Sequence, residues 1–114
     1  MIELFPELNE LGDVIGVEVY QEDDKIRDFS SLYNFIKWLF RYRCVGVDEP
    51  CHKRANDISH IRTGHDDSDW REIVLHCIQC HREYHDEGVS DEAIQKLKER
   101  RAEYLEVIGR EEYI

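Results

Sequence analysis

Residues 76–85 of the chain read His-Cys-Ile-Gln-Cys-His-Arg-Glu-Tyr-His, and this stretch decides the fold that we expect. Cys77 and Cys80 are separated by two residues, which is the spacing of a tight zinc knuckle. His81 and His85 follow four residues apart, so on a helix both imidazoles project from the same face. The stretch therefore predicts a metal knuckle that leads directly into a short helix carrying a pair of metal-binding histidines.

A second pair of thiols lies upstream of the knuckle. Cys44 and Cys51 enclose a loop of six residues, and 25 residues separate Cys51 from Cys77. Two cysteine pairs suit tetrahedral coordination of Zn²⁺ by four thiolates, Cys44, Cys51, Cys77 and Cys80. Four thiolates leave no open position, so we expect a structural zinc whose binding is coupled to folding. Two other interpretations stay open: some cysteines are buried small hydrophobes, or His52 or His76 replaces a thiolate.

The context of the cysteines favours metal binding over disulfides. No N-terminal stretch combines a basic start with a short apolar run, so the sequence predicts no signal peptide. The longest apolar patch, residues 35–40, is interrupted by Lys37 and is far too short to span a membrane. Because the sequence predicts neither secretion nor membrane insertion, we expect the cysteines to stay in the reducing cytosol, which keeps thiols free to bind metals. We therefore expect a soluble, cytoplasmic protein with no membrane partner.

The stretch before the knuckle predicts a hairpin. Residues 57–61, Asp-Ile-Ser-His-Ile, look like a short strand, and residues 63–69 are loop-like. The apolar run at residues 73–75 suits the returning strand. The predicted order is therefore strand, loop, strand, knuckle and helix, with His60 near the end of the first strand.

This ordered set resembles the HNH endonucleases, most closely their small phage and prophage members. The likeness rests on residues 57–61, Gly64, residues 66–70 and residues 76–88, and it covers about residues 41–88. It implies an α+β fold, in which a zinc-stapled, treble-clef-like ββα-metal core has flanking N- and C-terminal helices. In that family the first strand ends on a catalytic histidine, and the helix carries metal-binding histidines.

The resemblance also implies a reaction, the hydrolysis of phosphodiester bonds in DNA. Carried over by position, His60 is the general base that deprotonates water for attack on phosphorus. His81 and His85 hold Mg²⁺ or another divalent cation, which stabilises the leaving 3′ oxygen. Neutral imidazole titrates near pH 7 and so suits the base.

Two positions depart from the family pattern. Many relatives place a metal-binding Asp or His directly before the base, where this chain has Ser59. Asp57 lies two residues earlier on the same strand face and is an alternative metal ligand, although a turn-stabilising Asp is equally compatible with the sequence. Glu72 takes the place of the family's middle Asn, which braces the loop that holds the base. Asp67 and Asp69 are nearby substitutes for it.

The charge distribution bears on DNA binding. The formal net charge is −11, whereas binding to the DNA backbone relies on Lys and Arg. Residues 1–30 carry nine acidic against two basic residues, and residues 86–114 carry nine against five. Residues 41–62 instead carry five basic against three acidic residues. The candidates for DNA contacts are therefore the basic residues around the cysteines and histidines: Arg41, Arg43, Lys53, Arg54, Arg62 and Arg82.

We divide the chain into three segments. Residues 1–40 form an acidic N-terminal segment with a short strand and a packing helix. Residues 41–88 hold the core, whose helix we expect to stop near Gly88. Residues 89–114 hold a C-terminal helix.

The flanking elements have local signals. Residues 14–20 are rich in β-branched side chains and predict the strand. Ser30 or Ser31 caps the helix expected over residues 32–41. Ser90 followed by two acidic residues caps the last helix, which we expect to reach about residue 108, just before a glycine stop.

Two other functions remain open. A non-catalytic treble-clef zinc module, binding DNA or a protein partner, would keep the fold without the chemistry. Ser59, the missing Asn and the acidic charge favour it. The acidic N-terminal segment could also dock a basic protein partner such as phage packaging or recombination machinery, although a solvated acidic tail is the simpler interpretation. A nuclease should bind one tight zinc and one exchangeable ion, and a pure module only the zinc.

Overall fold

The computed structural model describes residues 2–61, 70–86 and 90–113. The chain divides into two compact units, residues 1–35 and residues 36–114. Among the described residues, no helix is both long enough and apolar enough to cross a membrane.

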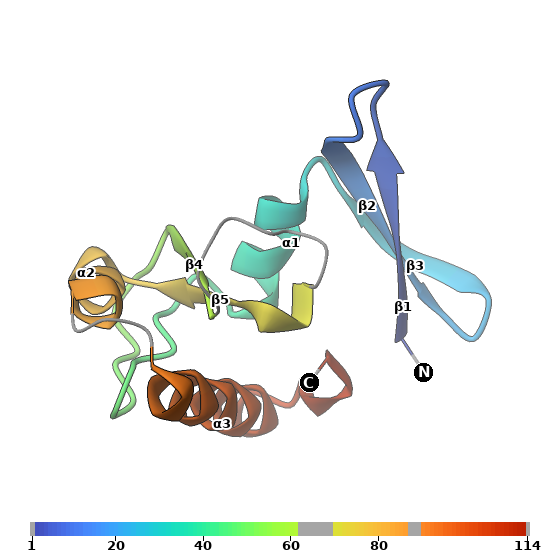
Figure 1. Ribbon diagram of the computed structural model, residues 1–114. Coiled ribbons are helices and arrows are strands. Elements are labelled where there is room, and N and C mark those ends of the chain that lie inside the picture. The colour runs from blue at the N-terminus through green and yellow to red at the C-terminus, as the bar shows by residue number, and fades with distance from the viewer. Residues whose placement is uncertain (1, 62–69, 87–89, 114) are drawn as a thin grey trace. The chain divides into compact units, whose positions relative to one another are not determined.

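The N-terminal unit is a three-stranded antiparallel sheet. Its strands β1 (Ile2–Leu8), β2 (Val14–Gln21) and β3 (Asp24–Phe29) pair in sequence order, as Figure 1 shows in blue. The sequence indicated β2 alone. β3 is mostly charged and its first five residues are exposed, so it carries no apolar signal. β1 contains Pro6, which an edge strand tolerates because one side of its backbone has no strand partner.

Pairing and a tight turn order these polar strands. Glu22 and Asp23 connect β2 to β3, and both have positive φ, 51° and 69°. Two-residue hairpin turns favour this conformation because it matches the twist of the strands. Val17 and Val19 of β2 are buried and supply the apolar face. The chain therefore forms β3 through hairpin geometry rather than through hydrophobic patterning.

Helix α1 (Leu32–Leu39) follows the sheet. The Oγ of Ser31 accepts a hydrogen bond from the backbone N–H of Asn34 at 3.1 Å, which confirms a serine N-cap. The helix ends two residues earlier than expected. Arg41 and Tyr42 both adopt positive φ, 54° and 59°, and so turn the chain out of the helix.

The C-terminal unit is built on a hairpin. β4 (Asp57–His60) and β5 (Ile73–His76) pair antiparallel, and α2 (Ile78–Asp86) follows directly (Figure 1). This confirms the predicted order of strand, strand and helix. All four residues of β5 are buried. The predicted loop at residues 63–69 and the helix stop at Gly88 lie outside the described residues.

The last long helix, α3 (Asp91–Val107), confirms its predicted limits. The Oγ of Ser90 accepts a hydrogen bond from the backbone N–H of Ala93 at 3.1 Å. Gly109 has a φ of 75° and ends the helix in the left-handed region. Short 3₁₀ turns, η1 (Trp70–Glu72) and η2 (Glu111–Tyr113), precede β5 and follow α3.

The Ser90 cap allows a direct test. Replacing Ser90 by alanine should lower the free energy of unfolding by about 1 kcal/mol, because the Ala93 N–H loses its acceptor. Urea unfolding followed by circular dichroism measures the change. Ser90→Asp is the matched control, since it keeps an acceptor at the cap and should retain most of the stability. An equal loss in both variants would contradict the capping role.

A buried arginine holds α3 to its neighbours. Arg101 is 3% exposed, and its Nε donates to the carbonyl oxygen of Ile73 at 3.3 Å. Its Nη2 donates to the carbonyl oxygen of Tyr113 at 3.1 Å. The guanidinium also lies over the rings of Phe40 and Trp70. Spacing alone did not identify it as a core residue, because a charged side chain on a helix is usually solvated.

Candidate functional site

The four cysteines come together in the C-terminal unit. Their sulfur atoms all lie within 4.8 Å of one another, and the Sγ atoms of Cys51 and Cys77 are 3.9 Å apart. Tetrahedral zinc with Zn–S bonds of about 2.3 Å separates its sulfurs by roughly 3.8 Å. The cluster could therefore hold a metal ion such as zinc, as the spacing predicted. His52 and His76 do not belong to the cluster.

Backbone geometry brings the thiols together. The N–H of Cys44 donates to the carbonyl oxygen of Lys53 at 2.7 Å, which closes the loop that contains Cys51. Within this loop Gly46 has a φ of 89°, and a Cβ there would lie 1.9 Å from the carbonyl oxygen of Glu49. Only glycine fits this position. Cys77 directly precedes α2, and Cys80 lies in its first turn.

Burial and crowding oppose the charged form of most of these thiols, an effect that a bound cation would offset. Burial raises the pKa of the Cys44 thiol to about 11. Burial and the neighbouring Cys44 also raise the pKa of Cys80 well above its usual range. Burial acts to raise the pKa of Cys77 too, but the backbone N–H of Cys80 and the neighbouring thiols outweigh it and lower that pKa. Thiolates in so small a space are stabilised together by a shared metal ion.

Beside this cluster lies a line of hydrogen bonds through two histidines. The Oγ of Ser59 is 2.6 Å from Nδ1 of His81 and 2.8 Å from Nδ1 of His76. On its other side, Nε2 of His76 lies 2.8 Å from the carbonyl oxygen of Gly46. We call Gly46, His76, Ser59 and His81 the histidine relay. It connects the cysteine loop, β5, β4 and α2.

The middle of the histidine relay is closed to solvent. Ser59 and His76 are both 0% exposed. Burial lowers the pKa of His76 to about 4, so its ring is neutral near pH 7. His76 also faces Asp57 across the hairpin, in register.

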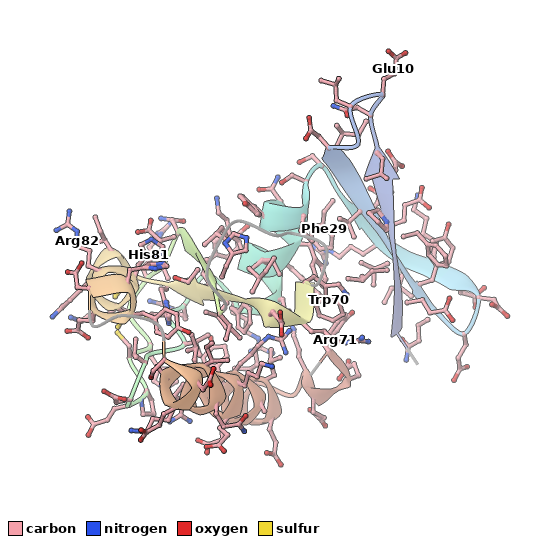
Figure 2. The ribbon with its side chains drawn as sticks, in the orientation of Figure 1. Glu10, Phe29, Trp70, Arg71, His81 and Arg82 are labelled. Carbon is pink, nitrogen blue, oxygen red and sulfur yellow. The ribbon has the colours of Figure 1, made fainter. Side chains whose placement is uncertain are left out.

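The predicted histidine pair lies on one face of α2. The rings of His81 and His85 have centroids 4.6 Å apart. His81 is half-buried and His85 is exposed. Figure 2 shows His81 on the side of α2 toward the hairpin, with Arg82 pointing away from it. The i,i+4 spacing therefore presents two imidazoles together, as expected.

The third predicted histidine, His60, is the last residue of β4 and pairs with Ile73. It is 7% exposed. Among the described residues, only the four cysteines form a set of three or more ligand groups with all ligand atoms within 4.8 Å. His60 therefore does not join His81 and His85 in such a set, nor does Asp57. The roles expected for these residues remain predictions.

Glu72 stands where the resemblance places a bracing Asn. Its carboxylate lies 3.3 Å from the Nζ of Lys98. Its carbonyl oxygen accepts a hydrogen bond from the N–H of Ile61 at 2.8 Å. The backbone of Glu72 thus holds the residue that follows His60. The proposed substitutes Asp67 and Asp69 lie outside the described residues.

The predicted DNA-binding residues lie on and next to the cysteine loop in the sequence, and one of them lies on α2. Arg41, Arg43, Lys53, Arg54 and Arg82 are all exposed, and Arg62 lies outside the described residues. Arg43 and Arg54 pair through an isolated β-bridge. Nη2 of Arg41 donates to the carbonyl oxygen of Ile108 at 3.0 Å, so part of this guanidinium stabilises the end of α3.

Sequence reasoning missed the functional potential of Ser59 and His76. It treated Ser59 as a departure from a family pattern and His76 as an alternative zinc ligand. A signal was present, because His76 ends the second strand directly before the knuckle and Ser59 shares a face of β4 with Asp57. The hydrogen bonds among them depend on the hairpin register, which the sequence alone did not fix.

In comparisons with known proteins, no family model, no curated protein and no solved structure matches this chain. Function therefore has to be inferred from the site itself.

Proposed function

We propose that this chain is a metal-dependent DNA endonuclease of the HNH type. The observation that supports the proposal is a hairpin followed by a helix, with His60 ending β4 and the pair His81 and His85 on one face of α2. Phosphodiester hydrolysis needs a base to activate water and positive charge beside the phosphate. Imidazoles on adjoining elements suit both needs.

The proposed roles follow from position. His60 accepts the proton of the attacking water. His81 and His85 hold a divalent cation, and Asp57 is a further candidate ligand. The cation, when bound, supplies the positive charge that offsets the charge developing on the phosphate and the leaving 3′ oxygen. Zn²⁺ in the four-cysteine cluster has a structural role, because four thiolates leave no position for substrate.

Exposed cations beside the cysteine loop would contact the DNA backbone. Arg43, Lys53 and Arg54 lie on the segment that the cysteines hold in place, and Arg82 lies on α2. Backbone contacts of this kind are strongly dependent on salt. With a net charge of −11, the protein should bind DNA through this local basic surface and only at moderate ionic strength.

One observation favours a second function, a non-catalytic zinc module. The resemblance places a metal ligand at position 59, whereas here the hydroxyl of Ser59 is engaged by His76 and His81. A chain that kept the fold and lost the catalytic cation would have this appearance. Such a module would still bind DNA or a protein partner.

Nicking of supercoiled plasmid separates the two functions. Purified, zinc-loaded protein is incubated with plasmid and Mg²⁺, Mn²⁺, Ni²⁺ or Zn²⁺, and in parallel with EDTA for a time too short to strip the structural zinc. A nuclease should convert the plasmid to open circles only when divalent metal is added. Metal analysis should then find one tight zinc and one exchangeable ion. Folded, zinc-loaded protein that cleaves with none of these metals would contradict the nuclease and favour the module.

A further inference from the structure

We infer that Ser59 is a positioning residue that fixes which ring nitrogen of His81 carries the proton. The inference follows from the donors and acceptors of the histidine relay. At one end of the relay, the carbonyl oxygen of Gly46 has an unambiguous chemistry. This oxygen can only accept a hydrogen bond, and it lies 2.8 Å from Nε2 of His76. Nε2 of His76 therefore carries a hydrogen.

The hydrogen-bonding roles of His76 and Ser59 follow from this end of the relay. His76 is 0% exposed, and its partners in the relay, the carbonyl of Gly46 and the hydroxyl of Ser59, are both uncharged. Burying a charged ring among uncharged partners is costly, so the imidazole has a single N–H and Nδ1 is an acceptor. Among the described residues the hydroxyl of Ser59 is its hydrogen-bond partner, at 2.8 Å, and the hydroxyl donates its one hydrogen there. The oxygen of Ser59 is then left with lone pairs facing Nδ1 of His81 at 2.6 Å. Nδ1 of His81 must be the donor in that contact.

The result is a defined tautomer of His81. With the hydrogen on Nδ1, Nε2 of the neutral ring carries an unshared electron pair. A metal-binding histidine commonly donates its other ring N–H to a fixed acceptor, which sets the tautomer and orients the ring. Ser59 provides that acceptor here. It would act on the cation through His81, although it occupies the position where the resemblance places a direct ligand.

The surroundings of Ser59 support a positioning role. The residue is 0% exposed, so its hydroxyl is surrounded by protein groups rather than by solvent. It lies on β4, between His76 of β5 and His81 of α2. Loss of the hydroxyl would leave both Nδ1 atoms without this partner. An imidazole released from such a constraint shifts toward the form with the hydrogen on Nε2, where the ligand electron pair is lost.

The tautomer can be measured without any catalytic metal. Full-length, zinc-loaded protein labelled with ¹⁵N-histidine is studied by long-range ¹H–¹⁵N NMR at about pH 8, where histidine is mostly neutral. The signals of His81 are identified by their loss in His81→Gln. In the wild-type protein His81 should have its hydrogen on Nδ1. Ser59→Ala should shift it toward Nε2, and Ser59→Thr, which restores a hydroxyl, should restore Nδ1–H.

Tyr84→Phe is the matched control. It removes another buried hydroxyl of α2, one that donates to the carbonyl oxygen of Ile61 and lies outside the relay. It should leave the tautomer of His81 unchanged. An Nε2–H form of His81 in the wild-type protein, or an unchanged tautomer in folded Ser59→Ala, would overturn the inference.

The catalytic consequence rests on the proposed nuclease function, so it is measured separately. If the wild-type protein nicks plasmid, Ser59→Ala should need about 10- to 100-fold more divalent metal for half-maximal nicking, and Ser59→Thr should recover most of the loss. No nicking by the wild-type protein would contradict the nuclease, while the NMR result would still decide the role of Ser59. Wild-type metal dependence in Ser59→Ala would overturn the positioning role.

Discussion

Withdrawing zinc from the four-cysteine cluster is expected to unfold residues 36–114 as a whole. The thiols come from two places, the loop around Cys44 and Cys51 and the start of α2 at Cys77 and Cys80. Zinc binding to small structural sites contributes about 10–16 kcal/mol, whereas whole domains are stable by only about 5–15 kcal/mol. A unit this small cannot lose that contribution and stay folded.

Chelation tests this expectation directly. A strong zinc chelator should abolish the near-ultraviolet circular dichroism of the aromatic residues packed around α3, and added Zn²⁺ should restore it. Cys51→Ser should reproduce the loss. Cys51→His is the matched control, because it keeps a zinc ligand at the half-buried position of the cluster. A chelated protein that unfolds at the same urea concentration as the untreated protein would contradict a structural metal.

Replacing His60 by alanine is expected to lower metal-dependent nicking by about 100-fold or more, while zinc content and fold are retained. A positioned general base contributes typically 10²–10⁴-fold to rate, and its removal leaves water without a proton acceptor. The effect should appear in kcat rather than in the concentration of plasmid needed. His60 is buried at the end of β4, so His60→Gln is a second variant that fills the same space without the base.

His52 offers the matched control for this experiment. It is an exposed histidine with a φ of 60°, so His52→Asn keeps a residue that tolerates the left-handed region. It lies outside the proposed catalytic residues and outside the cysteine cluster. Its nicking rate should match that of the wild-type protein. Equal rates in folded His60→Gln and His52→Asn would contradict the role of His60 as the base.

Local chemistry made part of this fold predictable. The β4–β5 hairpin has apolar runs, α3 has a serine cap, and α2 follows the cysteine knuckle, and the structure has each of them close to the expected limits. β1 and β3 were not predictable in the same way. They become strands by pairing with β2, and β3 has too few buried side chains to show an alternation.

The candidate site, like the fold, was only partly predictable from the sequence. Cysteine spacing predicted the cluster, and i,i+4 spacing predicted that His81 and His85 are neighbours. Each of the three links of the histidine relay joins residues 17 or more positions apart, so the relay depends on the register of β4 and β5. Arg101 was also missed, because its partners are backbone carbonyls of distant segments, which have no side-chain signature.

The cysteine cluster and the histidine relay both depend on the backbone of Gly46. Its N–H donates to the sulfur of Cys44 at 3.4 Å, and its carbonyl accepts from His76 at 2.8 Å. One peptide segment therefore faces a thiol on one side and the histidines on the other. A change in the conformation of the cysteine loop during evolution would also change the hydrogen bonds of the histidines, because the carbonyl of Gly46 in this loop is a member of the relay. The four-cysteine cluster and the proposed chemistry would have to be inherited, or abandoned, together.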